Sequence, residues 1–246
     1  MEALTDGQIA LRAVIVGLIV TFAVITGFAY TTLLERKLLA RLQARIGPNR
    51  AGYIPIPRKG KRELRLLGGF MQPAADAVKL FFKEDPTPAQ ADKFVYFIAP
   101  MLAVMPAILI LAVIPWAGPF TLGKLSFTPY FAIAPGVNVG VLFILAITSI
   151  GVYGIALAGW ASNSKYAVLG GIRTSAQMIS YELALGLSVL PPVMLANSLD
   201  LGQIVEAQRG LWFVVLNPLA ALIFYIGALA ELQRSPFDLL EAEQEL

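Results

Sequence analysis

The sequence predicts an all-α membrane protein, a polytopic helix bundle with about five transmembrane helices and one amphipathic interfacial helix. Three observations support this class. Hydrophobic residues make up 57% of the chain and charged residues only 14%, and the mean hydropathy is +0.71. A soluble domain of this size cannot bury that much apolar surface. Several apolar runs also reach the roughly 20 residues that a helix needs to cross ~30 Å of hydrocarbon.

The apolar runs define the expected order of elements. The first is followed by a dense basic loop and not by a cleavage site of small residues, so we interpret it as a retained helix and not as a secretory signal. The fourth is longer than one span requires, and we expect it to begin with a cytoplasmic turn that contains Gly170, Gly171 and Arg173. We therefore expect a single membrane domain, residues 1–246, with spans at residues 11–34, 94–116, 137–158, 172–196 and 211–230.

Lysine and arginine are concentrated in one loop. Of the 19 in the chain, 13 lie between Glu35 and Lys93. The positive-inside rule predicts that this loop, residues 35–93, and the acidic segment 231–246 are cytoplasmic, with the N-terminus outside and a bacterial plasma membrane as the location. A basic loop can also indicate a nucleic-acid partner, but membrane orientation already explains the charge, so we expect none.

The sequence contains neither cysteine nor histidine. This excludes disulfides, thiolate zinc sites and all-cysteine iron–sulfur clusters within the chain, and it removes the usual haem ligand. We predict no metal site and no catalytic residue with redox chemistry of its own. Any redox centre of an assembly would belong to a partner.

Within the basic loop, residues 64–84 are predicted to form an amphipathic helix at the membrane surface. Apolar residues recur every three to four positions, and Gln72, Asp76, Lys79 and Lys83 form a polar stripe. This pattern is typical of an interfacial helix. The periodicity does not distinguish a plain membrane anchor from a helix whose polar face lines a functional site.

One carboxylate, Glu182, is predicted in the middle of the fourth span, about 18 Å along the axis from Gly170. An ionisable group at that depth is costly unless it faces water or a partner. Arg173 is nine residues away and lies on the opposite helix face. Glu182 must therefore find another helix or water, or take up a proton. It is either a neutral group that joins helices by hydrogen bonding or a proton relay, which we favour.

The end of the sequence is rich in carboxylates. Ser235-Pro236 breaks the last helix as it leaves the bilayer. Such a run is often a solvated loop, but carboxylates held close together titrate as a coupled group, which suits a proton entry path. The carboxylates are Glu231, Asp238, Glu241, Glu243 and Glu245, with Arg234 as the only base among them.

Seven short motifs follow one another along nearly the whole chain. They are ERK at residues 35–37, RIGPNR at 45–50, QPAADAVK at 72–79, KED at 83–85, GWASNSKY at 159–166, ISYEL at 179–183 and SPFDLLEAEQEL at 235–246. Together they resemble the H subunit of NADH-quinone oxidoreductase, the membrane component of respiratory complex I that carries the quinone site. An ordered set is more specific than any single short pattern.

The resemblance implies a subunit on which the hydrophilic redox arm docks and which forms much of the quinone chamber. It implies quinone as the substrate, FMN and iron–sulfur clusters on partner subunits only, and antiporter-like membrane subunits as neighbours. The residues implied to line or brace the chamber are Glu35, Arg36, Arg45, Asp76, Lys79 and Glu84. Those implied in the path to the proton-pumping subunits are Glu182, Glu231, Arg234, Asp238, Glu241, Glu243 and Glu245.

The expected mechanism is indirect coupling. The arm reduces quinone in the chamber, and the change of charge there shifts the protonation of the acidic path. The alternative is the membrane anchor subunit of an energy-converting hydrogenase or a related ferredoxin-linked complex, which shares part of the motif set and needs no quinone chamber. A secondary transporter would predict internal repeats with broken helices, and the sequence shows none.

The chain departs from the family pattern in three places. A proline-rich, basic insertion at residues 53–65 puts the local chamber geometry in doubt. Ser149 stands where some members place another intramembrane glutamate, so the acidic path here is expected to have one carboxylate fewer. Family members continue past the position of Leu246 through a further loop and more helices, so we expect the sequence to be truncated at its C-terminal end.

Overall fold

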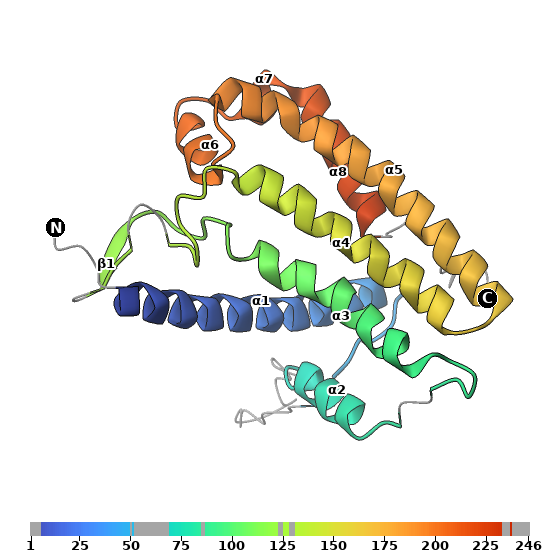
Figure 1. The fold of residues 1–246 in the computed structure, drawn as a ribbon. Coiled ribbons are helices and arrows are strands. Elements are labelled where there is room, and N and C mark those ends of the chain that lie inside the picture. Colours follow the sequence, from blue (N-terminus) through green and yellow to red (C-terminus); the bar gives the residue numbers. More distant parts are fainter. Residues whose placement is uncertain are drawn as a thin grey trace, which may run out of the picture. The chain divides into compact units, whose positions relative to one another are not determined.

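The computed structural model describes residues 6–49, 51, 69–84, 87–122, 125–127, 131–232 and 237. The chain divides into two compact units. The larger consists of Met1–Gly17 with Pro88–Leu246, and the smaller of Leu18–Thr87. Figure 1 shows the elements of both units along the sequence.

The described part of the chain is predominantly helical, which confirms the predicted all-α membrane class. Large apolar side chains point outward along the helices, among them Phe22, Leu187 and Met194, which are 73%, 67% and 78% exposed. Apolar surface of this extent is covered by lipid or by other subunits. The helices long and apolar enough to cross a membrane are α1 (Asp6–Leu42), α3 (Lys93–Ile110), α4 (Gly140–Ala161) and α5 (Lys165–Ala196).

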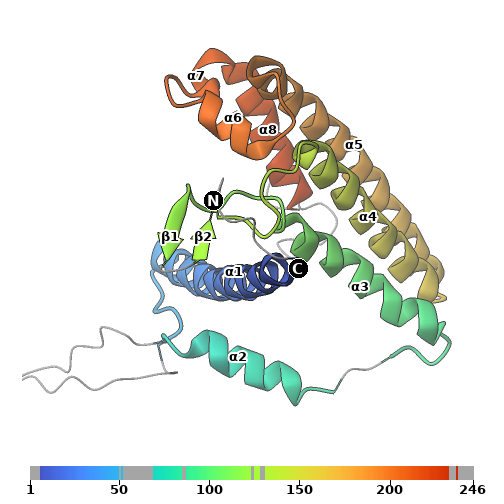
Figure 2. The same ribbon diagram turned by 60° about the vertical axis from the view of Figure 1, so that its left-hand side comes forward.

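In the larger unit, α4 packs against α3 and α5, and α5 also packs against α8 (Pro218–Glu231). Figures 1 and 2 show α4 between α3 and α5 from two directions. Glycine permits this close approach: a Cβ on Gly154 would lie 2.8 Å from the carbonyl oxygen of Ala99 in α3. Small residues at such contacts are the usual means of packing helices in membranes.

The core of this unit lies where α4 meets the segment that follows α5. Val141, Ile204 and Phe213 are buried there, and Leu145 and Val189 pack against them. Within a membrane such a contact is stabilised mainly by van der Waals packing of the side chains. This cluster holds α4 beside α5 at the end of the cavity described below.

Helix α5 corrects one prediction. It is continuous from Lys165 to Ala196, so the predicted turn at Gly170, Gly171 and Arg173 is wrong. A Cβ on Gly159 of α4 would lie 3.2 Å from the Cα atom of Gly171 and 2.8 Å from a carbonyl oxygen of α5. These glycines serve close helix packing, which outweighs their weak intrinsic helix propensity.

Helix α3 is shorter than the predicted span at 94–116. It begins after Asp92, whose carboxylate accepts hydrogen bonds from two backbone N–H groups of the first turn, as is typical of an N-cap. It ends at Ile110, a few residues before Pro115, which disfavours a helical conformation in the residue that precedes it.

A two-stranded hairpin, which the sequence did not predict, follows α3. Strand β1 (Phe120–Leu122) pairs antiparallel with β2 (Leu125–Phe127), and Thr121 is opposite Ser126. Strands this short carry too few residues for a period-2 pattern to be recognised.

The predicted fifth span, residues 211–230, is divided. Helix α7 (Phe213–Leu216) follows α6 (Leu201–Ala207) and stops at Asn217, and α8 starts at Pro218. Asn217 has φ −137° and ψ 66°, outside the α region, because a residue before proline is kept out of it. The 14 residues of α8 rise about 21 Å, less than the ~30 Å of a hydrocarbon core.

In the smaller unit, α1 continues beyond the predicted span at 11–34, so the start of the predicted loop is helical. The helix ends at Leu42, and Ala44 adopts a left-handed conformation with φ 55°. The backbone N–H of Arg45 then donates to the carbonyl oxygen of Ala40 at 2.7 Å. This arrangement satisfies a terminal carbonyl and stops the helix.

The amphipathic helix predicted at residues 64–84 is present as α2 (Gln72–Phe81) and has no buried residue. Residues 64–68 of the prediction lie outside the described residues, and 82–84 are not helical. The ring of Phe70, just before α2, stacks on Tyr30 of α1 with centroids 4.8 Å apart. The smaller unit therefore holds α2 against α1 by an aromatic contact as well as by the polar contacts described next.

Candidate functional site

Glu182 of α5 finds its partner on α4. Its Oε1 atom accepts hydrogen bonds from the hydroxyls of Ser149 at 2.5 Å and Thr148 at 3.1 Å. The two hydroxyls occupy successive positions of α4, which itself carries no acidic or basic residue. The sequence left another helix, water or a bound proton open as the compensation of Glu182, and the structure shows two neutral donors on another helix.

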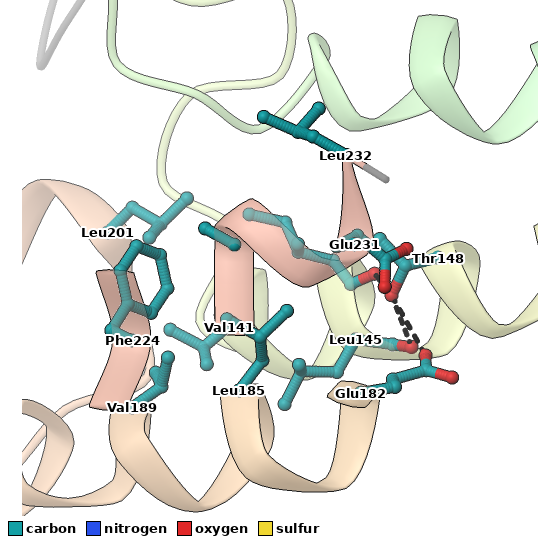
Figure 3. Close-up of a pocket in the computed structure, with 12 residues that line it drawn as sticks. Val141, Leu145, Thr148, Glu182, Leu185, Val189, Leu201, Phe224, Glu231 and Leu232 are labelled. Carbon is teal, nitrogen blue, oxygen red and sulfur yellow. Dashed lines mark hydrogen bonds between the residues drawn. The ribbon is translucent and has the colours of Figure 1, made fainter. Parts of the chain in front are cut away.

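A cavity of about 500 Å³ lies between α4, α5, α6 and α8. Its walls are mainly apolar, from residues such as Val141, Leu185 and Phe224, and its acidic groups are Glu182 and Glu231. Figure 3 shows both carboxylates and Thr148 at one end of the cavity, and the apolar side chains of Phe224, Val189 and Leu201 at the other. The polar end offers the several partners that an ordered water requires.

Glu231, the last residue of α8, has one buried carboxylate oxygen. This Oε2 atom makes no hydrogen bond within the described part of the chain. Glu231 also interacts electrostatically with Glu182, so a negative charge on one carboxylate makes a charge on the other less favourable. The structure thus brings together two of the predicted proton-path residues, which are 49 positions apart by their residue numbers.

The remaining predicted proton-path residues, Arg234, Asp238, Glu241, Glu243 and Glu245, lie outside the described residues.

Phe237, which is described, returns to α5. Its carbonyl oxygen accepts a hydrogen bond of 3.3 Å from Gln177, and its ring meets Tyr181 edge-on with centroids 5.5 Å apart. Tyr181 immediately precedes Glu182, so Phe237 lies beside the half-buried carboxylate. The sequence carried no signal for this contact.

In the smaller unit, Asp76 of α2 is the centre of a polar cluster. Its Oδ2 atom accepts a hydrogen bond of 2.9 Å from Nη1 of Arg36, and its Oδ1 atom accepts one of 2.9 Å from Gln72. The hydrogen bonds from Gln72 and Arg36 lower the pKa of Asp76, and the positive charges of Arg36 and Lys79 act in the same direction. The cluster is solvent-exposed, with 59% of the Arg36 side chain and 39% of the Asp76 side chain accessible.

Three of the predicted chamber residues are therefore brought together: Arg36, Asp76 and Lys79. Among the described residues, Arg45 and Glu84 do not join this cluster. The Arg45 guanidinium donates to the side chain of Gln43, and Glu84 is exposed beyond the end of α2. Glu35 is half-buried on α1, next to Arg36.

Sequence reasoning missed Thr148 as a partner of Glu182 and noted Ser149 only as a missing carboxylate. A signal was present, because two adjacent hydroxyl residues lie within an otherwise apolar span. Polar side chains inside a membrane helix usually form hydrogen bonds to a neighbouring helix.

The sequence of the chain is similar to those of known proteins. A family model described as NADH dehydrogenase matches residues 14–246. The chain is 51% identical over 228 residues to the NADH-quinone oxidoreductase H subunit 1 of Geobacter metallireducens, covering 93% of this chain and 64% of that protein. It is 44% identical to the NADH-quinone oxidoreductase H subunit of Syntrophotalea carbinolica, covering 99% of this chain and 69% of the relative.

A relative from Rhodothermus marinus, NADH-quinone oxidoreductase subunit 8, is 49% identical over 86% of this chain and 56% of its own length. The chain thus spans just under two thirds of the Geobacter relative. The matched region contains both the Arg36–Asp76 cluster and the carboxylates of the cavity. From this match over nearly its whole length, the chain belongs to the NADH dehydrogenase family.

Proposed function

We propose that this chain is a membrane subunit of a proton-translocating NADH:quinone oxidoreductase. In this role it forms part of the quinone chamber at the junction with the hydrophilic arm, and it begins the acidic path that couples quinone reduction to proton movement. The subunit contributes charges and hydrogen bonds, and it holds no redox centre of its own.

The observation that carries the proposal is the pair of carboxylates on one cavity. Glu182 and Glu231 line a largely apolar space of about 500 Å³, and a water molecule takes up roughly 30 Å³ in the liquid. Two carboxylates that line one cavity respond to each other's charge. Protons can then pass between the two groups when a charge nearby changes.

The cluster around Asp76 supports the chamber part of the proposal. Arg36 and Lys79 supply positive charge and hydrogen-bond donors at the start of the cytoplasmic loop, where the arm would dock. A quinone headgroup offers carbonyl oxygens as acceptors, and cationic donors stabilise the negative charge that develops as it is reduced. An opposite charge within ~4–6 Å moves a carboxylate pKa by roughly one to three units, which is enough to transfer a proton near neutral pH.

The proposal also covers the substrate, the partner subunits and the location of this subunit. Quinone is the substrate, FMN and iron–sulfur clusters are carried by partner subunits of the arm, and antiporter-like membrane subunits adjoin the acidic path. The location is a bacterial plasma membrane, with the N-terminus outside and the 35–93 loop in the cytoplasm. The names of the relatives favour this assembly over the energy-converting hydrogenase.

Purification of the assembled complex through a tag on this subunit tests the proposal. We expect the purified complex to oxidise NADH with quinone as acceptor, and the activity to be lost from membranes of a strain without the gene. A complex that evolves hydrogen from reduced ferredoxin and does not reduce quinone would instead support the hydrogenase alternative.

A further inference from the structure

We propose that Thr148 and Ser149 are positioning residues that hold Glu182 in place in either protonation state, by turning their hydroxyl hydrogens between its carboxylate and the backbone of α4. This inference rests on the proposed proton path. It assigns a role to two side chains that the path itself does not require.

Both hydroxyls reach the same atom of Glu182. Ser149 Oγ lies 2.5 Å and Thr148 Oγ1 lies 3.1 Å from Oε1 of Glu182. Consecutive residues of a helix are about 100° apart around its axis. The two hydroxyls therefore approach the carboxylate oxygen from different sides, and Figure 3 shows the bond from Thr148 beside the cavity.

Each hydroxyl also has an acceptor within its own helix. Ser149 Oγ is 2.9 Å from the carbonyl oxygen of Leu145, and Thr148 Oγ1 is 3.0 Å from the same oxygen and 3.1 Å from that of Ile144. A hydroxyl has one hydrogen and two lone pairs. It can donate to the carboxylate or to the backbone, but not to both at once with full strength.

The consequence is a pair of alternative hydrogen-bond arrangements with the same heavy-atom positions. When Glu182 is ionised, both hydroxyls donate to Oε1. When Glu182 carries a proton, its O–H donates to one hydroxyl oxygen, and that hydroxyl donates to a backbone carbonyl of α4. No helix has to move, so Glu182 can gain and lose a proton within a packed bundle.

Among the described residues around Glu182, the two hydroxyls are the donors to its carboxylate. Of the elements packed against α5, α4 carries no acidic or basic residue. Helix α6 carries Glu206, which is exposed and pairs with Arg209, and α8 presents Glu231, a carboxylate that also lines the cavity. Glu231 opposes a charge on Glu182 and offers it no positive partner. The donors that the ionised Glu182 uses in the described residues are Thr148 and Ser149.

Infrared difference spectroscopy of the assembled complex, recorded between two pH values, tests the proposal directly. The carboxylic C=O band of Glu182 is assigned by its loss in Glu182→Gln. In the Thr148→Val/Ser149→Ala double variant we expect this band at higher wavenumber, because the carboxyl group has lost its hydrogen bonds. Each single variant should show part of the displacement, and Ser149→Thr should keep the band in place.

The coupled rate supplies a second readout. Hydrogen bonds to charged groups contribute enough for the double variant to lose about tenfold in coupled quinone reduction, a factor that corresponds to roughly 1.4 kcal/mol. Ser180→Ala is the matched control, because the Ser180 hydroxyl on α5 donates to the carbonyl oxygen of Ala176 and is exposed. It should change neither the band nor the rate.

The proposal is overturned if the band stays in place in the double variant and in both single variants, or if Ser180→Ala displaces it equally. If the double variant does not assemble, the single variants and Ser149→Thr decide. The band reports the hydrogen bonding of the protonated Glu182 carboxyl group, whether or not this residue relays protons to the pumping subunits. A failure of the proposed proton path, seen as full coupled activity in Glu182→Gln, is therefore distinguishable from a failure of this inference.

Discussion

Arg36 on α1 donates a hydrogen bond of 2.9 Å to Asp76 on α2 and forms an ion pair with it. The two residues are 40 positions apart in the sequence, and the contact joins a long apolar helix to an exposed amphipathic one. Because Gln72 occupies the other carboxylate oxygen, Asp76 is oriented from two sides.

Replacement of Asp76 by asparagine should impair quinone reduction several-fold and leave reduction of an artificial acceptor by the arm intact. Asparagine removes the negative charge that orients Arg36, while the arm and its redox centres are untouched. Both rates can be measured on the same membranes. Glu206→Gln on α6, which breaks the exposed Glu206–Arg209 pair, is the control and should leave both rates unchanged. A parallel fall of both activities in Asp76→Asn would show that the residue serves assembly.

The contact between α1 and α2 should depend on pH. The pKa of Asp76 is lowered in the folded protein. Its ionised carboxylate therefore stabilises the contact at every pH above about 4, the ordinary pKa of an aspartate. That stabilisation is lost as the pH falls through the lowered value. The chain has no cysteine, so spin labels at Leu39→Cys and Phe82→Cys give one defined pair. We expect one narrow distance distribution from pH 7 to 5 and a broad one in strong acid.

The Asp76→Asn variant with the same labels should show the broad distribution at every pH. A distribution that remains narrow in this variant would mean that the Tyr30–Phe70 stack alone holds α2.

Gly159→Ala should destabilise the packing of α4 on α5. The added Cβ would lie 2.8 Å from the carbonyl oxygen of Ala167, a backbone atom that cannot move aside as a flexible side chain can. Overpacking of this kind costs about 1–3 kcal/mol, so thermal unfolding of the purified complex should occur at lower temperature. Gly151→Ala on the same helix meets nothing within 4 Å and should be neutral or slightly stabilising.

Glu182→Gln should assemble normally and yet lose coupled quinone reduction and proton pumping together, by at least about tenfold. Glutamine keeps the size of the side chain and its acceptor oxygen for Thr148 and Ser149, but it cannot titrate. Glu182→Asp should retain part of both activities. Membrane vesicles assayed for quinone reductase rate and for the pH gradient provide the measurement. Full rate and full gradient in the glutamine variant would show that Glu182 is a packing residue.

The orientation of the chain is open to a direct test. A reporter fused within residues 52–62, which lie outside the described residues, should give a cytoplasmic signal because the surrounding loop holds 13 of the 19 lysines and arginines. A reporter between α5 and α6, for instance after Asn197, should give the opposite signal. A periplasmic signal from the first fusion would reverse the orientation and place the Arg36–Asp76 cluster on the wrong side for the arm.

Much of the architecture could be predicted from the sequence because it depends on local properties. The long apolar runs determined the membrane class and the approximate places of α1, α3, α4 and α5, since a span needs a minimum length of apolar residues. The stripe around Asp76 and Lys79 likewise determined the amphipathic character of α2. The depth of Glu182 within its span also came from the sequence, and with it the expectation of a partner.

Tertiary packing decided which partner Glu182 has. Thr148 and Ser149 are 34 and 33 residues away, and only the packing of α4 on α5 turns these hydroxyls toward the carboxylate. The same contact decided that Gly171 continues a helix, because its role is to admit the backbone of Gly159, a relationship that no local propensity contains. The chemistry of each side chain and the length of each apolar run can be read from the sequence. The pairing of helix faces is determined only when the helices pack together.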